Sequence, residues 1–536
     1  MIRILSVTFL ILLVSAAPAD KKASTPDFKN ASANGKLVNE GFNRCIKFVN
    51  GWMKYTDPAT GLIPRNITDS KDYWNAWDAA ADNYPFMVLT SSILMPDFFS
   101  TKARQMLETE KRVTSRIGKL PDTYSFSKKG YRNEVIDTSQ VIFGSAEYMK
   151  DGLIPLTEWL GQSPWSDRML EILNDLPKLV RVVKEIRGSF YGNSAVVEVN
   201  GDLLQVLSRM YWFTGKREYL EWAAEIADYY LNEQRLPTIG LNRLRIRDHG
   251  CEIISGLCET YLAAYYSWPE KRVQWQKYIH LMLDRILEVG RNSDGLFYNE
   301  VNPVTGEIIS KGIADNFGYT LNAYYFVGQL DNKPAYRDAV LKALGTLDSK
   351  YRNFDWESGS CDGYADAIEG TLNLYNREPV ASAKEWLDSE TKVMWKFQKP
   401  DGVIEGWHGD GNFARTTIMY CLWKTQGLLP DIWNEKLMVG ATGGKDGINV
   451  AVSCETGWSG KIKFDSPRSR DKMHLPVDYP RINQFQQWFT VEKEKKYEIA
   501  FFPKGNKKIY SGEELISGMP LTVRPGEEIL FTVIPL

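Results

Sequence analysis

Side chains that could carry acid–base chemistry gather at several points of the sequence, each where an apolar helical stretch begins. The clearest runs are Trp74–Asp82, Arg243–Glu252, Cys361–Glu369 and Trp407–Arg415. Asp and Asn are preferred caps of a helix N-terminus, so capping is the simpler explanation for any one of these side chains. Caps need no Trp, His or Arg beside them, however, and the set as a whole predicts a shared site at the helix starts.

Two carboxyl groups that face one cavity are what the hydrolysis of a glycosidic bond needs. One protonates the leaving oxygen, and the other activates water or attacks the sugar directly. Burial beside rings such as Trp74, Trp77 and Trp407 would raise the pKa of the acid partner. Spacing along the chain does not pair the carboxylates, because the partners must be close in space. We expect the pair to come from Asp82, Asp248, Glu252 and Glu369.

The run before Glu252 contains three alternating arginines. In an extended segment Arg243, Arg245 and Arg247 project to one face, while Leu244 and Ile246 take the other. Such a row is either a solvated strand edge or a cluster that binds a carboxylate or sulfate on a substrate. The side chains that we expect to contact a substrate are Trp74, Arg245, Arg247, His249, Tyr319, Trp407, His408, Asp410 and Arg415.

The motifs of several other chemistries are absent from the sequence. It contains no Walker loop, no Gly-x-Gly-x-x-Gly after a strand, no His-Glu-x-x-His and no Gly-x-Ser-x-Gly. The six cysteines are scattered without a Cys-x-x-Cys pair, and the chain has only four histidines. We therefore expect buried free thiols, no metal site and no cofactor.

The elements that must position these residues are helices of two kinds, which alternate along residues 37–430. A helix that is apolar on most sides must be enclosed, whereas a helix with a charged face meets water. Seven such pairs recur, which predicts a mainly α fold, an (α/α) toroid of six to seven helical hairpins. The outer helices are expected near 38–55, 101–117, 165–183, 218–234, 272–289, 335–351 and 381–397, and the inner ones near 82–94, 138–160, 195–213, 252–266, 315–327, 366–375 and 412–425.

Both ends of the chain differ from this pattern. Residues 1–19 have a charged start, an apolar run from Ile4 to Val14 and small residues to Ala19, as in a signal peptide. That run is too short to span a bilayer, so we expect export to the periplasm or the exterior. Residues 20–36 are expected to be a linker. Residues 431–536 read as short strands between turns, which predicts a small C-terminal β-sandwich that packs on the toroid.

The composition excludes several classes of protein. Hydrophobic residues make up 43% of the chain and charged ones 25%, which indicates a folded protein. The formal net charge is −2, so a surface for nucleic acids is not expected. The aromatic content of 12% suits both core packing and a cleft that stacks on sugar rings.

The alternating helices, the aromatic and acidic helix starts, the leader and the β tail together resemble the six-hairpin glycosidase superfamily over residues 37–430. The run Arg247–Glu252 and the arginines before it look more like the uronate-active branches, the glucuronidases and unsaturated glucuronyl hydrolases. The resemblance implies catalytic acids among the four carboxylates named above. It also implies substrate contacts from Arg247, His249, His408 and Arg415. Seven helix pairs instead of six are a departure from the family.

The sequence thus predicts an exported glycoside hydrolase that acts on acidic, uronic-acid-containing glycans by acid–base catalysis. Two alternatives stay open at this point. A polysaccharide lyase would use a Tyr or His base beside a neutralised carboxylate, and a glycan-binding protein would bind the same sugars without turnover. The residues that could serve a lyase are Tyr84, His249, Asn316, Tyr319 and Tyr364.

Overall fold

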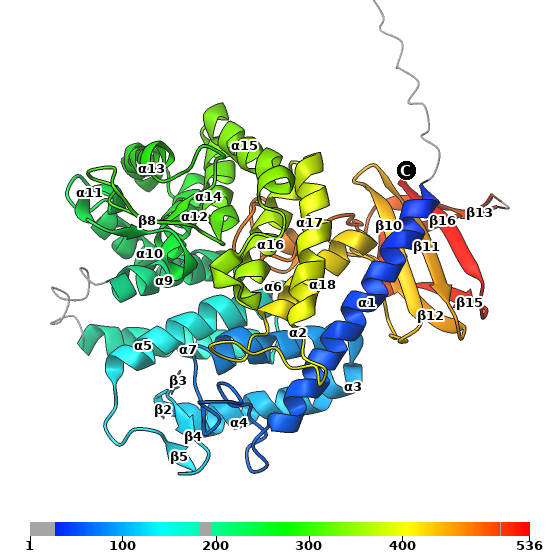
Figure 1. The fold of residues 1–536 in the computed structure, drawn as a ribbon, viewed down its shortest axis with the longest axis horizontal. Coiled ribbons are helices and arrows are strands. Elements are labelled where there is room, and N and C mark those ends of the chain that lie inside the picture. The colour runs from blue at the N-terminus through cyan, green and yellow to red at the C-terminus, as the bar shows by residue number, and fades with distance from the viewer. Residues whose placement is uncertain (1–26, 183–193, 504) are drawn as a thin grey trace, which may run out of the picture.

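Two concentric rings of helices form most of the computed structural model, which describes residues 27–182, 194–503 and 505–536 (Figure 1). Each inner helix packs on the next, and the last packs on the first, so the ring closes. The inner ring comprises α2 (Tyr84–Leu94), α5 (Thr138–Glu147) continued by the π-helical turn η4 (Tyr148–Leu153) and α6 (Ile154–Leu160), α9 (Ser194–Thr214), α12 (Glu252–Ser267), α14 (Phe317–Leu330), α16 (Cys361–Tyr375) and α18 (Asn412–Thr425).

The outer helices alternate with the inner ones along the chain. In α14 every residue from Phe317 to Val327 is buried, whereas the outer helices bury one face only, which is the difference that their apolar patterns predict. Seven pairs are present among the described residues, so the (α/α) toroid is confirmed with seven hairpins. The outer ring comprises α1 (Phe28–Trp52), α4 (Arg104–Thr114), α7 (Pro164–Val182), α10 (Arg217–Tyr230), α13 (Pro269–Val289), α15 (Pro334–Lys350) and α17 (Ala381–Met394).

Glycines allow neighbouring inner helices to approach closely. A Cβ added to Gly256 in α12 would lie 2.5 Å from the carbonyl oxygen of Gly201 in α9. Gly318 in α14 and Gly370 in α16 face each other in the same way, with an added Cβ 2.5 Å from backbone. Larger residues would force these helix pairs apart and widen the ring.

The C-terminal part contains two antiparallel sheets with a shared apolar core. α1 packs along β10 and β11, next to α18, so it joins the toroid to the sheets (Figure 1). One sheet has the strand order β10 (Leu437–Gly444), β11 (Gly447–Cys454), β16 (Glu528–Pro535), β13 (Lys496–Phe502) and β14 (Asn506–Ser511), and the other has β15 (Met519–Val523), β12 (Trp458–Lys463) and β9 (Leu429–Pro430).

The N-terminal boundary differs from the expected one. α1 begins at Phe28, where Asp27 caps it, so residues 28–36 are helical and not a linker. Ala31, Gly35 and Val38 are buried, and an added Cβ on Gly35 would lie 3.4 Å from β10, so contact with the sheet extends the helix. The expected signal peptide, residues 1–19, lies outside the described residues. No helix in the described part of the chain is both long enough and apolar enough to cross a membrane.

A long connection between β12 and β13 leaves the sheets and enters the toroid. We call residues 466–489 the inserted segment; it contains one short helix, α19 (Arg468–Asp471). Arg377 near the end of α16 pairs with Asp478 at 3.1 Å, and Lys472 contacts Trp159 near the end of α6. The segment therefore enters at the C-terminal ends of the inner helices, opposite the helix starts.

Candidate active site

A cavity of about 580 Å³ opens where the inner helices begin. Its walls come from the turns before α2 and α18, from η4, and from the starts of α12, α14 and α16. The helix starts thus meet around one cavity. The acidic residues that line it are Asp78, Asp82, Glu147, Asp151, Asp248, Glu252, Glu357, Asp362, Asp366, Glu405 and Asp410, and the basic ones are Arg65, Lys150, His408 and Arg415.

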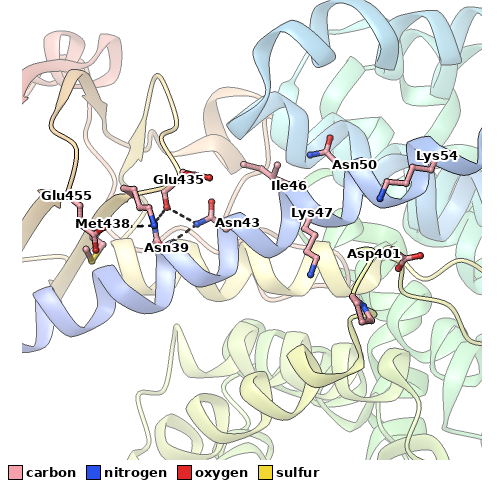
Figure 2. A pocket seen from close by; sticks show the side chains of 12 residues that line it. Asn39, Asn43, Ile46, Lys47, Asn50, Lys54, Asp401, Glu435, Met438 and Glu455 are labelled. Carbon is pink, nitrogen blue, oxygen red and sulfur yellow. Dashed lines mark hydrogen bonds and ion pairs between the residues drawn. The ribbon is translucent and has the colours of Figure 1, made fainter.

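A second cavity of similar volume lies along α1 at the junction with the sheets (Figure 2). Its most prominent polar contacts are structural. The Asn39 side chain donates to the carbonyl oxygens of Glu435 and Leu437, at 2.7 and 2.8 Å, and Asn43 donates to the first of these at 3.0 Å. These amides attach α1 to the sheet edge, so the cavity at the helix starts is the candidate active site.

Asp82 lies in the π-helical turn η2 (Ala79–Asn83) that leads into α2, and its carboxylate lines the cavity. Burial raises the pKa of Asp82 well above its usual range, against the opposing charge of His408 at 3.9 Å. Burial alone would lower the pKa of His408, but the carboxylates of Asp82 and Asp78 outweigh it and raise this pKa to about 9. His408 is therefore an imidazolium at neutral pH, and it favours a negative charge on Asp82.

Asp362, in the first turn of α16, shares a hydrogen-bond donor with Asp82. The Asn412 amide nitrogen donates to Asp362 at 2.8 Å and to Asp82 at 3.5 Å. One oxygen of Asp82 and one oxygen of Asp362 therefore both lie within 3.5 Å of the same amide nitrogen. Burial and the neighbouring Asp410 and Glu357 raise the pKa of Asp362 to about 7, so this group titrates near neutral pH.

Asp366 lies one turn deeper in α16 and also lines the cavity. It accepts from the Tyr319 hydroxyl at 2.8 Å and from Arg415 at 2.9 Å. Burial and the charge of Asp362 raise its pKa to about 7, although the Arg415 guanidinium opposes this shift. Asp366 and Asp362 therefore form a row of two protonatable groups on one face of α16.

Glu369, from the expected catalytic pool, is not in the cavity. It is fully buried one turn below Asp366, where its carboxylate lies 2.9 Å from Arg415 Nε and accepts from the Tyr319 hydroxyl at 3.0 Å. Glu369, expected in the catalytic pool, is therefore not among the described residues that line the cavity. Its role in this geometry is to hold Arg415 and Tyr319.

Glu252 lines the cavity, but hydrogen-bond donors already occupy it. The Lys150 ammonium donates to Glu252 at 2.6 Å, and the Gln205 amide donates to its other oxygen. Burial would lower the pKa of Lys150, but Asp151 and Glu252 raise it well above its usual range, so the lysine stays charged. Because both oxygens of Glu252 accept from buried side chains, we assign it a structural role in the cavity wall and not acid catalysis.

Each of the three arginines of the row pairs with an acid. Arg243 is exposed and pairs with Glu300 on the neighbouring strand at 2.7 Å, and Arg247 contacts Glu357 at 3.2 Å. Arg245 pairs with Asp248, which lines the cavity, but neither Arg245 nor Arg247 is among the described lining residues. The structure thus places these two arginines in ion pairs beside the cavity and not in its described lining, so it gives no support to the substrate contacts expected of them. The side chain of His249 lies outside the described part of the structure.

The aromatic residues near the cavity take different positions. Trp74, from which we expected a sugar contact, is buried and is not among the described residues that line the cavity. Trp77 and Trp407 line the cavity, and Trp407 is 81% exposed with the Arg65 guanidinium 5.3 Å from its ring centre. Glu405 accepts from the Ile67 amide at 2.7 Å and anchors the Trp407 loop. Trp407 thus presents an open ring face at the mouth of the cavity.

Asp78, Asp82 and His408 offer three ligand atoms within 4.8 Å of one another, the geometry of a possible metal site. Asp78, however, accepts from Arg65 Nε and from the Asn75 amide, each at 2.5 Å. His408 is held as a cation by its acidic neighbours. This group is therefore explained by ion pairing and hydrogen bonding between the side chains themselves.

Several lining residues were outside the expected set. Asp362 and Asp366 belong to the run that we singled out, and they lie at i and i+4 of the same helix, seven and three residues before Glu369. The helical period shows that all three face inward but not which of them reaches the cavity. Ile482, in the inserted segment, also lines the cavity, and no pattern in the sequence connects it to the helix starts.

No protein-family model matches this chain, and no curated protein matches it. Solved structures that resemble it include an inactive variant of the alpha-1,6-mannanase GH76A of a Salegentibacter species in complex with alpha-1,6-mannotetrose, with a TM-score of 0.41 and 11% identity over 71% of this chain and 97% of that one. Cellobiose 2-epimerase from Bacillus thermoamylovorans has a TM-score of 0.40 and 12% identity, over 72% of this chain and 98% of the epimerase. Unsaturated glucuronyl hydrolase from a Bacillus species has a TM-score of 0.36 and 11% identity, over 55% of this chain and 87% of the hydrolase. Similarity at this level does not determine the reaction.

Proposed function

We propose that this protein is a glycoside hydrolase in which Asp362 is the general acid and Asp82 is the second carboxylate. The observation that carries the proposal is the pair itself, two cavity-lining carboxylates that share the Asn412 amide. Glycosidic hydrolysis needs two carboxyl groups of this kind on either side of the scissile bond.

The charges around the two carboxylates support this division of roles. Two buried acids this close share one negative charge more readily than they carry two. Burial raises the pKa of both carboxylates; at Asp82 the largest opposing cause is the His408 imidazolium, whereas at Asp362 the neighbouring Asp410 and Glu357 add to the rise before His408 opposes it. Asp362 would thus protonate the leaving oxygen, and Asp82 would activate water or attack the sugar.

The charge of the cavity favours neutral sugars over the acidic ones expected from the arginine row. The basic groups in its wall are already paired: Arg65 with Asp78, Lys150 with Asp151 and Glu252, Arg415 with Asp366 and Glu369, and His408 with Asp82. A uronate carboxylate would therefore meet carboxylates and no unpaired cation among the described lining residues. The open face of Trp407 and the many carboxylate acceptors suit a sugar ring with neutral hydroxyl groups.

The alternative of a lyase has less support from the geometry. The Tyr319 hydroxyl donates to Asp366, and burial raises the pKa of Tyr319 well above its usual range, so it is a poor base. Tyr84 is buried with its hydroxyl bonded to the Ala103 carbonyl, and Tyr364 donates to the carbonyl of Phe354.

Export remains part of the proposal and rests on the apolar leader at residues 1–19.

The test is turnover of chromogenic glycosides and of neutral and uronate oligosaccharides by the wild-type chain. A hydrolase releases new reducing ends, whereas a lyase gives a product that absorbs ultraviolet light. Asp82→Asn and Asp362→Asn should each lower kcat by about 10²–10⁴-fold while substrate still binds. The matched control is Asp446→Asn, an exposed acid in a turn of the sheets. Full activity of either cavity variant, or an ultraviolet-absorbing product, contradicts the proposal.

A further inference from the structure

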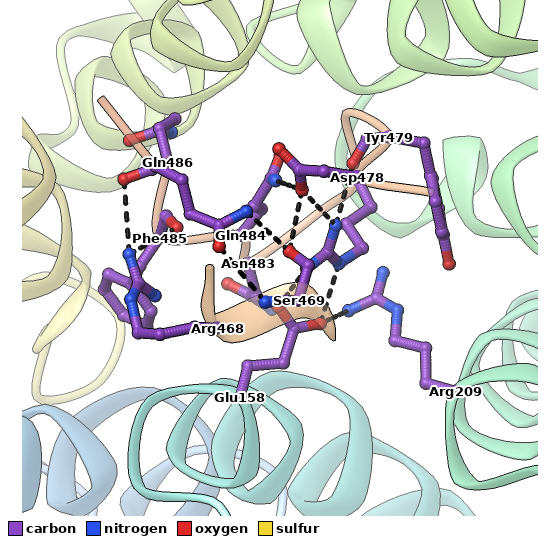
Figure 3. Close-up of polar contacts among 12 residues, drawn as sticks. Glu158, Arg209, Arg468, Ser469, Asp478, Tyr479, Asn483, Gln484, Phe485 and Gln486 are labelled. Atoms are coloured by element: carbon purple, nitrogen blue, oxygen red, sulfur yellow. Dashed lines mark hydrogen bonds and ion pairs between the residues drawn. The ribbon is translucent and has the colours of Figure 1, made fainter. Parts of the chain in front are cut away.

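The inserted segment closes the end of the toroid that lies opposite the helix starts (Figure 3). Arg481 forms a two-fold ion pair with Glu158 of α6, at 2.8 and 2.6 Å. The Tyr479 hydroxyl donates to Glu259 of α12 at 2.8 Å, and Arg209 of α9 donates to the Ile482 carbonyl at 2.9 Å. Every one of these side chains is buried, so the segment is an integral part of the toroid interior.

The tip of the segment reaches the cavity from below. Ile482 is 2% exposed, packs with Cys251 and Tyr319, and lines the cavity. Helix starts form the upper wall, and this side chain from the other end of the chain forms part of the base. The β-sandwich part of the chain therefore contributes directly to the site.

Asn483, next to Ile482, connects three inner helices. Its backbone N–H donates to Glu369 of α16 at 2.5 Å, and its side-chain oxygen accepts from Arg415 of α18 at 2.9 Å. Its side-chain nitrogen donates to Asp151 of η4 at 3.0 Å. All three hydrogen bonds are buried, and one residue satisfies groups from three walls of the cavity.

The backbone of Asn483 is in the left-handed region, with φ of 61°. Asn tolerates this conformation better than other residues except Gly, because its short polar side chain can bond locally. The conformation directs the side chain and the backbone N–H toward different helices. Asparagine therefore suits both the left-handed backbone at position 483 and the three hydrogen bonds made there.

We propose that Asn483 is a positioning residue, supplied by the C-terminal part of the chain, that holds Arg415 against Asp366 in the wall of the active site. The proposal rests on the function proposed above. Arg415 lies between Asn483 Oδ1 and the Asp366 carboxylate, each at 2.9 Å, and its Nε faces Glu369. Without the Asn483 oxygen as an acceptor, the Arg415 guanidinium moves away from the cavity wall. The two carboxylates of α16, Asp362 and Asp366, then shift with it.

The test compares two substitutions of Asn483. One should disturb the position of Arg415 more, and the other should lower the stability of the protein more. Asn483→Gly keeps the left-handed backbone and the N–H to Glu369 but removes the acceptor for Arg415. Asn483→Asp keeps that acceptor but places a buried carboxylate against Asp151. We expect kcat to decrease in the order wild type, Asn483→Asp, Asn483→Gly, with a loss of up to about 10²-fold for the glycine variant and little change in KM.

Asn483→Asp should have the lower melting temperature of the two variants, because its carboxylate and that of Asp151 repel each other. A purely structural role for Asn483 would rank kcat and Tm in the same order, and that result overturns the proposal. Gln487→Ala is the matched control: Gln487 bonds Ser469 at the outer end of the same segment, so it should lower Tm and leave kcat unchanged.

A crystal structure of Asn483→Gly gives a readout that does not depend on turnover. Arg415 should lie away from Asp366 in this variant, and an unmoved Arg415 contradicts the proposal. If Asp82→Asn and Asp362→Asn abolish turnover while Asn483→Gly does not lower kcat, the proposed function stands and the positioning role fails. If wild-type protein turns over no glycoside, the proposed function fails and the position of Arg415 still decides the role of Asn483.

Discussion

Replacing Arg481 with methionine should strongly destabilise the protein, because Arg481 forms the most buried ion pair between the inserted segment and the toroid. Its guanidinium is 1% exposed and binds both oxygens of Glu158, which is 3% exposed. It also donates to the Tyr479 carbonyl at 2.8 Å and so fixes the turn before Ile482. Methionine fills a similar volume but leaves the buried Glu158 carboxylate with Arg209, at 3.5 Å, as its one remaining cation among the described residues.

The magnitude follows from the burial of the partner left behind. Breaking a buried ion pair by removal of one member lowers the free energy of unfolding by about 3–5 kcal/mol, because the remaining charge is uncompensated. The exposed pair between Arg470, on the same segment, and Glu492, just beyond it, offers a matched control, with side chains 59% and 39% exposed. Loss of an exposed pair lowers the free energy of unfolding by about 0–1 kcal/mol.

The assay is urea unfolding followed by tryptophan fluorescence, with linear extrapolation to water. Arg481→Met should show the large loss and Arg470→Met the small one. The double variant Glu158→Met with Arg481→Met should recover much of the loss, because no unpaired carboxylate remains and Arg209 keeps its ion pair with Glu259 at 2.7 Å. Equal, small effects of Arg481→Met and Arg470→Met would refute the reasoning, as would a double variant less stable than Arg481→Met.

Three further predictions concern the active site. The rate should fall as pH rises through about 7, because Asp362 with its raised pKa must hold a proton to act as the acid, and a pH profile of kcat/KM with no loss on that side contradicts this role. His408→Gln removes the cation that opposes the raised pKa of Asp82, so the acidic limb of the same profile should move to higher pH; an unmoved limb means that Asp82 is not the base. Trp407→Ala should raise KM several-fold with little change in kcat or Tm, because the ring is 81% exposed, and an unchanged KM excludes a sugar contact.

Much of the toroid could be predicted from the pattern of apolar residues. The inner helix expected at 315–327 is α14 at Phe317–Leu330, and the one expected at 412–425 is α18 at Asn412–Thr425. A helix enclosed by others must be apolar on all sides, and this requirement is visible in the local sequence. The early start of α1 was missed because its first turns, with Ala31 and Gly35, are buried by β10, far away in the chain.

The candidate active site was predicted at the helix starts, and the structure brings only some of the expected residues to the cavity there. Asp82 lines the cavity as expected, while Glu369 does not, although both belong to runs of the same type. The arginines before Asp248 alternate as the pattern predicts, with Leu244 and Ile246 buried, but their partners Glu300 and Glu357 are remote in sequence. A charge pattern shows where a cation is exposed along a strand, and it does not show which distant acid neutralises it.

The sequence by itself determined that enclosed and solvated helices alternate, and that acids and rings collect where the enclosed ones begin, because burial and helical period act over a few neighbouring residues. Only the tertiary structure decided that Asp82 and Asp362 share the amide of Asn412, that Glu369 lies one turn too deep, and that Ile482 and Asn483 complete the site from the opposite end. These are distances between residues far apart along the chain. They depend on how seven hairpins close into a ring and on which segment fills its centre, and no local pattern encodes either.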